Sequence, residues 1–320
     1  MVTFLKQNGK GLIKTAFLEP DCWVHVYNPT RLEIDTLENE HNVSMDVIHD
    51  ILDPDERSRW EKEDGMQTII IRIPCFDSMR EVPWYTIPLG IILLKDLIIT
   101  MSLQESEIIN DLIGNRVKNL DLLNKKAFLL LLLNRSTAYF LKYLKDINRQ
   151  TSQVERELQQ SVQNRELVRL LTMEKSLVYF TTSLKSNELL VEKLHRTILL
   201  SLSEEEEDLM DDVLTEHRQA IEMANIYSNI LSGLMDAFAS VISNNLNVVM
   251  KRLTTISIVL MIPTLVASLY GMNIGLPFQH SSSAFILVLA IAVVLSTCAG
   301  FLFNRLNKMR PMIGRRRRKK

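Results

Sequence analysis

The stretch of sequence that decides the fold runs from Leu253 to Asn304 and reads LTTISIVLMIPTLVASLYGMNIGLPFQHSSSAFILVLAIAVVLSTCAGFLFN. It contains no Asp, Glu, Lys or Arg. A helix needs roughly 20 apolar residues to cross the core of a bilayer, and turn-forming and polar residues interrupt this stretch once, at residues 271–282. We therefore expect two transmembrane helices, at about residues 252–270 and 283–303.

The charges on either side of this stretch predict its orientation. Lys251 and Arg252 precede it, and Arg305, Lys308 and a basic run at residues 315–320 follow it. Because Lys and Arg concentrate in cytoplasmic segments, we expect both termini to lie in the cytoplasm of a cell-membrane protein. The loop at residues 271–282 would then face outward, and the basic tail at residues 304–320 would contact anionic membrane lipids.

The remaining composition argues against several other classes of protein. The net charge is −1, and the three cysteines are widely separated and odd in number, which indicates no disulfide framework. The six histidines form no HExxH pair, and neither a GxSxG nor a GxxxxGK[ST] motif is present. We expect no enzyme activity, no organic cofactor and no nucleic-acid partner.

The N-terminal part of the chain, residues 1–120, is expected to form a cytoplasmic domain of mixed helices and strands. Runs rich in β-branched residues predict strands at Gln67–Cys75, Tyr85–Leu94 and Leu97–Ser102. Helical spacing of apolar residues occurs at Arg31–Glu38 and Ser44–Leu52. The fold class is therefore α+β, with a small sheet covered by helices.

Long helices are expected from there to the membrane, because Gly and Pro become rare. The apolar run Ala127–Leu133 is too short to cross a membrane, and we interpret it as the buried face of a helix. Residues 121–202 are expected to form a helical hairpin, with one helix to about Gln160 and a second from about Asn164 to Leu200.

The last and longest helix is predicted over residues 203–270. Ser203 and Glu206 form a capping box at its start, where further glutamates suit the helix dipole. A seam with alternating spacings of three and four residues then follows, which is typical of a helix packed against other helices. It comprises Val213, His217, Ala220, Ala224, Tyr227, Leu231, Leu234, Phe238, Val241, Asn245 and Val248.

One face of this helix stays polar or small through the apolar stretch. It carries Asn247, Met250, Thr254, Ser257, Met261, Thr264 and Ser268, again spaced by three and four residues. Such a face serves either close helix packing or the lining of a water-filled path, and the spacing alone leaves both open. Two spans cannot enclose a pore, so conduction would require a symmetric homo-oligomer.

The triplet Gly271-Met272-Asn273 stands where the first span ends, and it is followed by one last span and a basic tail. In this position the sequence resembles the CorA family of magnesium transporters. Pro263 within the first span and the segment Leu-Met-Asp-Ala-Phe at residues 234–238 extend the resemblance. It covers essentially the whole chain.

The resemblance implies a funnel-shaped homopentamer that conducts Mg²⁺ into the cytoplasm, with the long helix lining the pore. Gly271, Met272 and Asn273 would form the selectivity filter, with Asn273 as the outer ring of metal-binding groups. The constrictions of the pore would correspond to Asn247, Leu253 and Met261. Regulatory Mg²⁺ would bind between cytoplasmic domains, at metal-binding carboxylates that match Asp77 and Asp212.

Physical arguments favour the same roles. Mg²⁺ gives up its waters reluctantly, so neutral Asn273 amide oxygens can accept hydrogen bonds from the hydrated ion and still release it. Met261 and Leu253 would form apolar collars that close by dewetting. Asp77 also fits an ordinary turn, and Asp212 follows several other acids and also fits a solvated helix face.

The outer loop departs from the pattern of many family members, because residues 274–283 contain no carboxylate. Electrostatic capture of cations should therefore be weaker. His280 in this loop favours softer ions, so import or efflux of Co²⁺, Ni²⁺ or Zn²⁺ by the same architecture stays open. A membrane-anchored sensor without transport is the more remote alternative.

Overall fold

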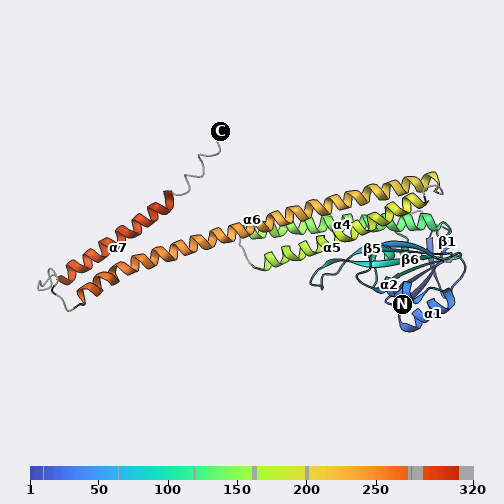
Figure 1. The fold of residues 1–320 in the computed structure, drawn as a ribbon, viewed down its shortest axis with the longest axis horizontal. Coiled ribbons are helices and arrows are strands. Elements are labelled where there is room, and N and C mark those ends of the chain that lie inside the picture. Colours follow the sequence, from blue (N-terminus) through green and yellow to red (C-terminus); the bar gives the residue numbers. More distant parts are fainter. Residues whose placement is uncertain are drawn as a thin grey trace. The chain divides into compact units, whose positions relative to one another are not determined.

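The computed structural model describes residues 1–9, 11–63, 65–117, 120–160, 164–198, 202–272, 275 and 284–309. It divides into two compact units, residues 1–236 and residues 237–320, and each is treated by itself (Figure 1). The first unit contains one seven-stranded sheet and most of the helices, and the second contains two helical segments.

The sheet has the strand order β2-β1-β3-β7-β6-β5-β4, and β3 and β7 form its parallel pair among antiparallel neighbours. The strands are β1 (Val2–Asn8), β2 (Gly11–Thr15), β3 (Cys22–Tyr27), β4 (Arg59–Glu63), β5 (Met66–Phe76), β6 (Trp84–Leu93) and β7 (Leu97–Ser102). Every residue of β6 and β7 is buried, as expected for central strands that are covered on both faces.

Helices cover both faces of this sheet. On one face α1 (Arg31–His41) and α2 (Met45–Leu52) bury Leu37, Ile48 and Ile51 against Val24 and Ile99. On the other face lie α4 (Lys125–Gln160) and α5 (Asn164–Ile198), where the Phe128 ring meets the edge of Trp23 at 5.2 Å between centroids (Figure 1). A short helix, α3 (Glu107–Ile113), precedes them. The α+β class with long helices is confirmed.

The sheet is larger than the sequence predicts, because the predicted strands correspond to β5, β6 and β7 alone. The strands that were not predicted are β1, β2, β3 and β4. Of these, β2 and β4 are the edge strands, whereas β3 is buried between β1 and β7. β4 reads RWEKE and is largely exposed, and β2 buries only Leu12. Edge strands have one exposed side and short lengths, so the alternation of apolar and polar residues that identifies a strand is weak in them.

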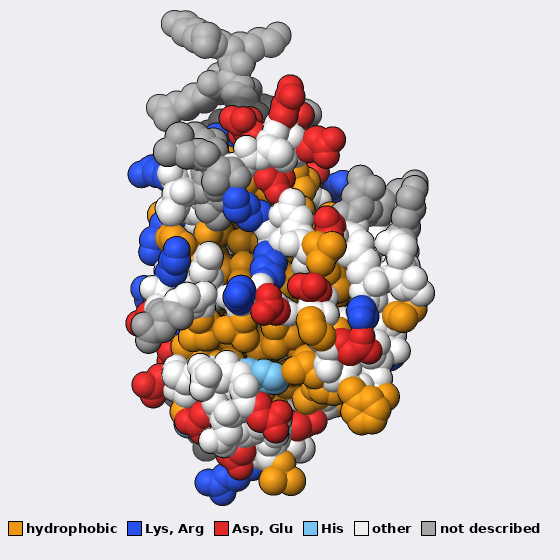
Figure 2. Space-filling model, turned by 90° about the vertical axis from the view of Figure 1, so that its right-hand side faces the viewer, with side chains coloured by type: hydrophobic (Ala, Val, Ile, Leu, Met, Phe, Trp, Pro, Cys, Tyr) orange, Lys and Arg blue, Asp and Glu red, His pale blue; other side chains and the backbone are white. Residues whose placement is uncertain are grey.

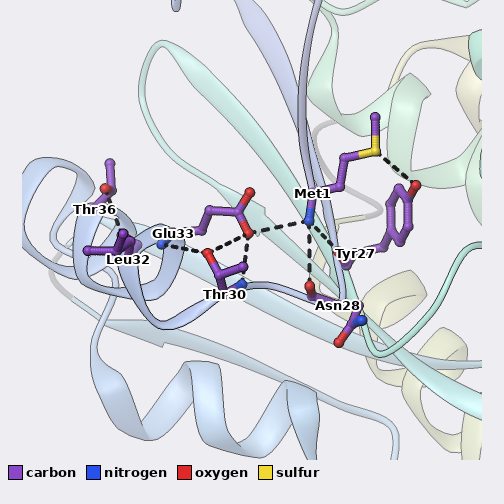
Figure 3. A network of polar contacts seen from close by, with 7 residues as sticks. All are labelled: Met1, Tyr27, Asn28, Thr30, Leu32, Glu33 and Thr36. Atoms are coloured by element: carbon purple, nitrogen blue, oxygen red, sulfur yellow. Dashed lines mark hydrogen bonds and ion pairs between the residues drawn. The ribbon is translucent and has the colours of Figure 1, made fainter.

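The start of β1 is held by the residues that begin α1 (Figure 3). The Met1 amine donates to the Tyr27 carbonyl at 2.7 Å and lies 3.3 Å from the Glu33 carboxylate. Glu33 also accepts from the Thr30 backbone N–H at 2.8 Å, as the N3 residue of a capping box. One carboxylate therefore connects the first strand to the first helix.

Where β5 extends beyond its pairing with β4, an asparagine of α5 makes the backbone hydrogen bonds that a neighbouring strand would make. Beyond the residues paired with β4, the backbone N–H of Arg72 donates to Asn187 Oδ1 at 2.9 Å, and Asn187 Nδ2 donates to the Arg72 carbonyl at 2.8 Å. Asn187 is 2% exposed, so this pairing satisfies buried backbone groups that water cannot reach. It fixes α5 against the sheet.

Gly90 in β6 allows α2 to pack directly on the sheet. A Cβ at this position would overlap the Ile51 side chain, with Cγ2 at 2.8 Å. Gly90→Ala is therefore expected to lower the free energy of unfolding by about 1–3 kcal/mol through overpacking, measured by denaturant unfolding. The double variant Gly90→Ala/Ile51→Val should recover part of this loss. If the losses of unfolding free energy caused by Gly90→Ala and by Ile51→Val simply add in the double variant, α2 does not press on Gly90.

His25 predicts a loss of stability in acid. The side chain is 2% exposed and its Nδ1 lies 3.0 Å from Thr100 Oγ1, and burial lowers its pKa from 6.5 to about 4. The folded state therefore favours neutral His25. The contribution of His25 to the free energy of unfolding is complete above pH 6.5. It is lost as the pH falls from 6.5 toward 4, by about 3 kcal/mol in all.

The measurement is the difference between wild type and His25→Gln in unfolding free energy across this pH range. The variant should show a flatter pH profile, because it removes the titrating group. His41→Gln at the end of α1 serves as the control and should keep the wild-type slope. Equal slopes for wild type and His25→Gln would contradict the assignment.

The long helix α6 (Glu204–Tyr270) begins with the capping box that the sequence predicts. The Ser203 backbone N–H donates to Glu206 Oε2 at 2.8 Å, and the Glu206 N–H donates to Ser203 Oγ at 3.4 Å. The predicted seam is buried at Val213, His217, Ala220, Ala224, Leu231 and Phe238. From residue 239 to 254 every position is exposed in the single chain.

His217 joins three helices within the seam. Its Nε2 lies 2.8 Å from the Leu184 carbonyl of α5, and its Nδ1 lies 3.1 Å from Thr137 Oγ1 of α4. Because a carbonyl only accepts, Nε2 carries the proton in the bond to Leu184. The single hydroxyl proton of Thr137 lies within reach of both Nδ1 and the Leu133 carbonyl, which is 3.0 Å from Oγ1. Burial lowers the pKa of His217, so the junction favours the neutral ring.

Acidic and basic side chains are interspersed among exposed apolar ones on the face that Figure 2 shows. Such a mixture of both signs is typical of a solvent-exposed surface. The second unit differs in kind: α7 (Ala284–Met309) exposes large apolar side chains such as Phe285 (78%) and Phe301 (70%). Water disfavours such a surface, whereas lipid does not.

Candidate ion-conducting site

Two described helices are long and apolar enough to cross a membrane, namely α6 and the Phe285–Phe303 part of α7. The apolar part of α6 continues as helix through Pro263 to Tyr270. Proline inside a helix removes one backbone hydrogen bond, here the one to the Val259 carbonyl. The neighbouring Thr264 Oγ1 donates to the Leu260 carbonyl at 3.0 Å. Within membrane helices such hydroxyl contacts help to satisfy backbone acceptors.

This part of α6 has two distinct faces. The polar face, defined above as residues 247, 250, 254, 257, 261, 264 and 268, is exposed at every position. Residues 255, 258, 259, 262, 263, 266 and 270 are partly buried and form what we call the covered face. At 100° per residue the mean directions of the two faces differ by roughly 150°. The polar face is therefore left free within one chain.

Small side chains of α7 approach the covered face. Ala292 and Ser296 are 5% and 8% exposed, and a Cβ on Gly300 would stand 3.5 Å from Val259 Cγ2. These three positions are spaced by four residues, the small-xxx-small pattern that lets membrane helices approach closely. Of the two roles that the sequence left open, close packing is visible for the covered face. These α7 residues were not predicted from the sequence, although their spacing was a usable signal.

The hydroxyl groups on the polar face present acceptors outward. Thr254 Oγ1 donates to the Met250 carbonyl at 2.8 Å, as Thr264 does to Leu260. A hydroxyl that uses its proton on its own helix leaves its oxygen lone pairs for other partners. Leu253 and Met261, the predicted apolar collars, are 57% and 66% exposed. The polar face with Leu253 beside it therefore exposes both apolar surface and oxygen acceptors.

The helix ends at the Gly-Met-Asn triplet. The Gly271 N–H donates to the Ala267 carbonyl at 2.9 Å, and the Met272 N–H donates to the Leu269 carbonyl at 3.3 Å. A Cβ on Gly271 would lie 3.4 Å from the Ala267 carbonyl oxygen, an ordinary van der Waals contact. Asn273 and His280 lie outside the described residues.

Asp77 lies in the turn that follows β5. Its Oδ1 accepts from the Met79 N–H at 2.9 Å, its Oδ2 lies 3.8 Å from Arg80 Nε, and its side chain is 44% exposed. One oxygen thus stabilises the turn, which matches the ordinary role considered above. The other oxygen stays accessible to solvent and to a cation.

Asp212 is exposed on the first part of α6, one turn before Glu216. The pKa of Glu216 is raised, first by partial burial and then by the negative charge of Asp212. Two carboxylates in this relation favour a nearby cation, which relieves their repulsion. Among the described residues, no hydrogen bond or ion pair joins Asp77 to Asp212.

Within the described ranges, no group of three or more His, Cys, Asp or Glu side chains could hold a metal ion. In an oligomer, ligands from several copies of the chain, or neutral oxygens such as those of the polar face, could hold a cation. Repetition by symmetry multiplies each exposed ligand into a ring.

Comparisons with known proteins agree with this architecture. The family model for the CorA-like Mg²⁺ transporter protein matches residues 21–305. The cobalt/magnesium transport protein CorA of Methanocaldococcus jannaschii is 26% identical over 288 residues, which cover 88% of this chain and 90% of that protein. The CorA protein of Thermotoga maritima is 24% identical over 81% of this chain and 75% of its own length.

Solved structures show the same fold. The complete structure of the M. jannaschii CorA magnesium transporter aligns with a TM-score of 0.79 at 24% identity, covering 95% of this chain and 98% of that one. The full-length CmaX protein aligns with a TM-score of 0.68 at 17% identity, covering 96% and 97%. Because the family model spans most of the sheet and the two apolar helices, this chain belongs to the CorA-like Mg²⁺ transporter protein family.

Proposed function

We propose that the chain forms a homopentameric channel for divalent cations in the cell membrane, through which the membrane potential drives Mg²⁺ into the cytoplasm. The observation that carries this proposal is the polar face of α6. It is exposed in the single chain, it points away from the covered face, and it leads to the Gly-Met-Asn triplet. Five such faces around one axis would line a water-filled path.

The proposed pathway begins at the ring of Asn273 side chains. Their amide oxygens would accept hydrogen bonds from the waters of Mg²⁺, which the ion gives up reluctantly. Inside the pore, Thr264, Ser257 and Thr254 would supply further oxygens, and Met261 and Leu253 would close the path when the helices tighten. Asn247 and Met250 would form its cytoplasmic end.

The driving force needs no nucleotide hydrolysis. A charge that crosses the membrane gains about 2.3 kcal/mol per 100 mV, and a divalent ion gains about twice that. With both termini in the cytoplasm, the basic tail at residues 304–320 would lie beside anionic lipid headgroups. These contacts would help to hold the second span in place.

We propose that cytoplasmic Mg²⁺ closes the channel by binding at Asp77 and Asp212 of neighbouring copies. The exposed oxygen of Asp77 and the like-charged pair formed by Asp212 and Glu216 support this role. When Mg²⁺ is lost, carboxylates across the interface would repel each other and loosen the closed state.

Asp212→Asn tests this gating proposal. The variant is expected to conduct Mg²⁺ at an internal Mg²⁺ concentration that shuts the wild type, because a neutral side chain no longer needs a cation to remain close to its partner. The measurement is flux into proteoliposomes loaded with increasing Mg²⁺. Asp211→Asn, at the adjacent exposed position, is the matched control. Normal closure of Asp212→Asn would exclude this carboxylate from the gate.

A second ion class has specific support. The M. jannaschii and T. maritima relatives are named for cobalt as well as magnesium, and His280 in the outer loop is a ligand that favours softer ions. Transport of Co²⁺, Ni²⁺ or Zn²⁺, inward or outward, is therefore the alternative for the same pore.

The deciding experiment measures flux of Mg²⁺, Co²⁺, Ni²⁺ and Zn²⁺ into proteoliposomes that contain the purified protein. A potential, negative inside, is imposed with potassium and valinomycin and then omitted. Faster Mg²⁺ entry with the potential supports the proposal. Movement of the softer ions alone would retain the pore and change the ion, and no flux of any ion would favour a membrane-anchored sensor.

A further inference from the structure

The first unit contains a cavity that the transport proposal does not use. It lies between the loop before β4, the facing ends of β5 and β6, and the outer side of α5, with a volume of about 730 Å³. Cavities of roughly 300–1,000 Å³ are the usual size of small-molecule sites. A single phosphate ion would leave most of this space empty.

The floor of the cavity holds a cation that has only neutral hydrogen-bond partners. Arg72 donates to the carbonyls of Pro54 (2.5 Å) and Glu56 (2.9 Å), and to both the carbonyl and the hydroxyl of Thr86 (2.9 Å each). Burial lowers the pKa of Arg72, while the nearby negative charges of Asp55, Asp53 and Glu56 act in the opposite direction. A partly buried positive charge of this kind attracts an anion.

Two more arginines stand at the rim. Arg80 lies 3.9 Å over the ring of Tyr85, which holds its guanidinium beside the opening. Arg57 is exposed and forms no ion pair with any residue that the structure describes. Arginine binds phosphate oxygens through two parallel N–H donors, and these two guanidinium groups have donors to spare.

Two of the acids at the rim are paired with cations outside the cavity lining. Glu56 is paired with Arg59, and Glu81 with Lys175 at 3.0 Å. Asp55 keeps its carboxylate unpaired among the described residues. Three arginines and three acids line the cavity, so their formal charges balance. Arg80 also lies 3.8 Å from Asp77, which leaves Arg57 as the rim arginine without an ion pair among the described residues.

The remaining wall is apolar and aromatic. Val178 and Tyr179 of α5 are 55% and 47% exposed and line the cavity together with Val82. An exposed tyrosine ring beside arginines suits a planar ring such as a nucleobase, because bases of every kind stack on aromatic side chains. Hydroxyl groups of Thr182, Ser183 and Ser186 complete the lining.

We propose that this cavity binds a phosphorylated organic anion of about the size of a nucleotide, with its phosphates at Arg57 and Arg80 and its ring against Tyr179. Arg80 also lies 3.8 Å from Asp77. An anion that binds Arg80 would therefore offset the positive charge that Arg80 places beside the Asp77 carboxylate. This last consequence rests on the proposed regulatory role of Asp77, whereas the binding site itself does not.

The test is equilibrium binding of ATP to the full-length protein in detergent, by calorimetry, with EDTA and then with Mg²⁺. Arg57→Gln/Arg80→Gln should weaken binding at least tenfold, and Tyr179→Ala severalfold. Asp55→Asn should strengthen binding, because it removes the unpaired carboxylate. Arg218→Gln, on the exposed side of α6, is the control and should bind as the wild type does.

Tripolyphosphate separates the two parts of the ligand. Weaker binding of tripolyphosphate than of ATP, with no effect of Tyr179→Ala on it, supports a site for an organic phosphate. Equal binding of both, or ATP binding that the arginine variants leave unchanged, overturns the proposal, as does the absence of saturable ATP binding. None of these outcomes depends on ion flux, so the transport proposal is tested separately.

Discussion

Replacing Asn273 by alanine is expected to reduce potential-driven Mg²⁺ flux more than tenfold while leaving the protein folded and assembled. The physical reason is the loss of a ring of neutral oxygens that would accept hydrogen bonds from hydrated Mg²⁺ at the pore entrance. The measurement compares initial rates of Mg²⁺ entry into proteoliposomes with matched protein content. Size-exclusion chromatography in detergent reports assembly.

The same loop supplies a matched control for this substitution. Gln279→Ala removes another amide and should keep most of the flux, because Gln279 stands outside the triplet. Asn273→Asp should bind the ion more strongly and release it more slowly, since a charged ring holds a divalent cation tightly. Wild-type flux in Asn273→Ala would remove this residue from the filter and leave the pore without its proposed entrance.

Cysteines placed on the polar face of α6 are expected to make transport sensitive to a positively charged thiol reagent. Cys22 and Cys75 are buried and Cys298 is exposed, so a Cys298→Ala background removes the reactive native thiol. In that background, Ser257→Cys and Thr264→Cys should lose nearly all flux after treatment. A bulky cation fixed inside the path would block it sterically and repel Mg²⁺.

The covered face supplies the controls for this experiment. Val259→Cys and Val266→Cys differ from their targets by only two residues, yet they lie on the partly buried side of α6. They should keep their flux after treatment. Block at Val259→Cys and none at Ser257→Cys would mean that the polar face serves packing between helices, the alternative that the spacing left open.

The features of α6 that sequence could predict depend on neighbours along the chain. The Ser203–Glu206 capping box and the buried positions of the seam as far as Phe238 follow from spacing within one helix. Local hydrogen bonds and helical periodicity require no knowledge of the rest of the fold. The two apolar spans were predictable for the same reason.

The features that sequence could not predict depend on contacts between distant residues. Asn187 completes the edge of β5 from a helix more than a hundred residues later, and no local pattern marks that role. The edge strands β2 and β4 have too little apolar alternation to stand out. The contacts that Asp77 makes within its turn agree with the ordinary turn that the sequence suggests. Binding of the proposed cation by Asp77 depends instead on other copies of the chain.

The strand order of the sheet also bears on how the chain is made. Every strand partner lies within residues 2–102, including the parallel pair of β3 with β7 that closes the sheet. The first apolar span begins about 150 residues later, at Leu253. At a synthesis rate of about 5–20 residues per second, the ribosome needs roughly 8–30 s to cover that distance. The sheet therefore has time to complete its strand pairing before any hydrophobic segment reaches the insertion machinery.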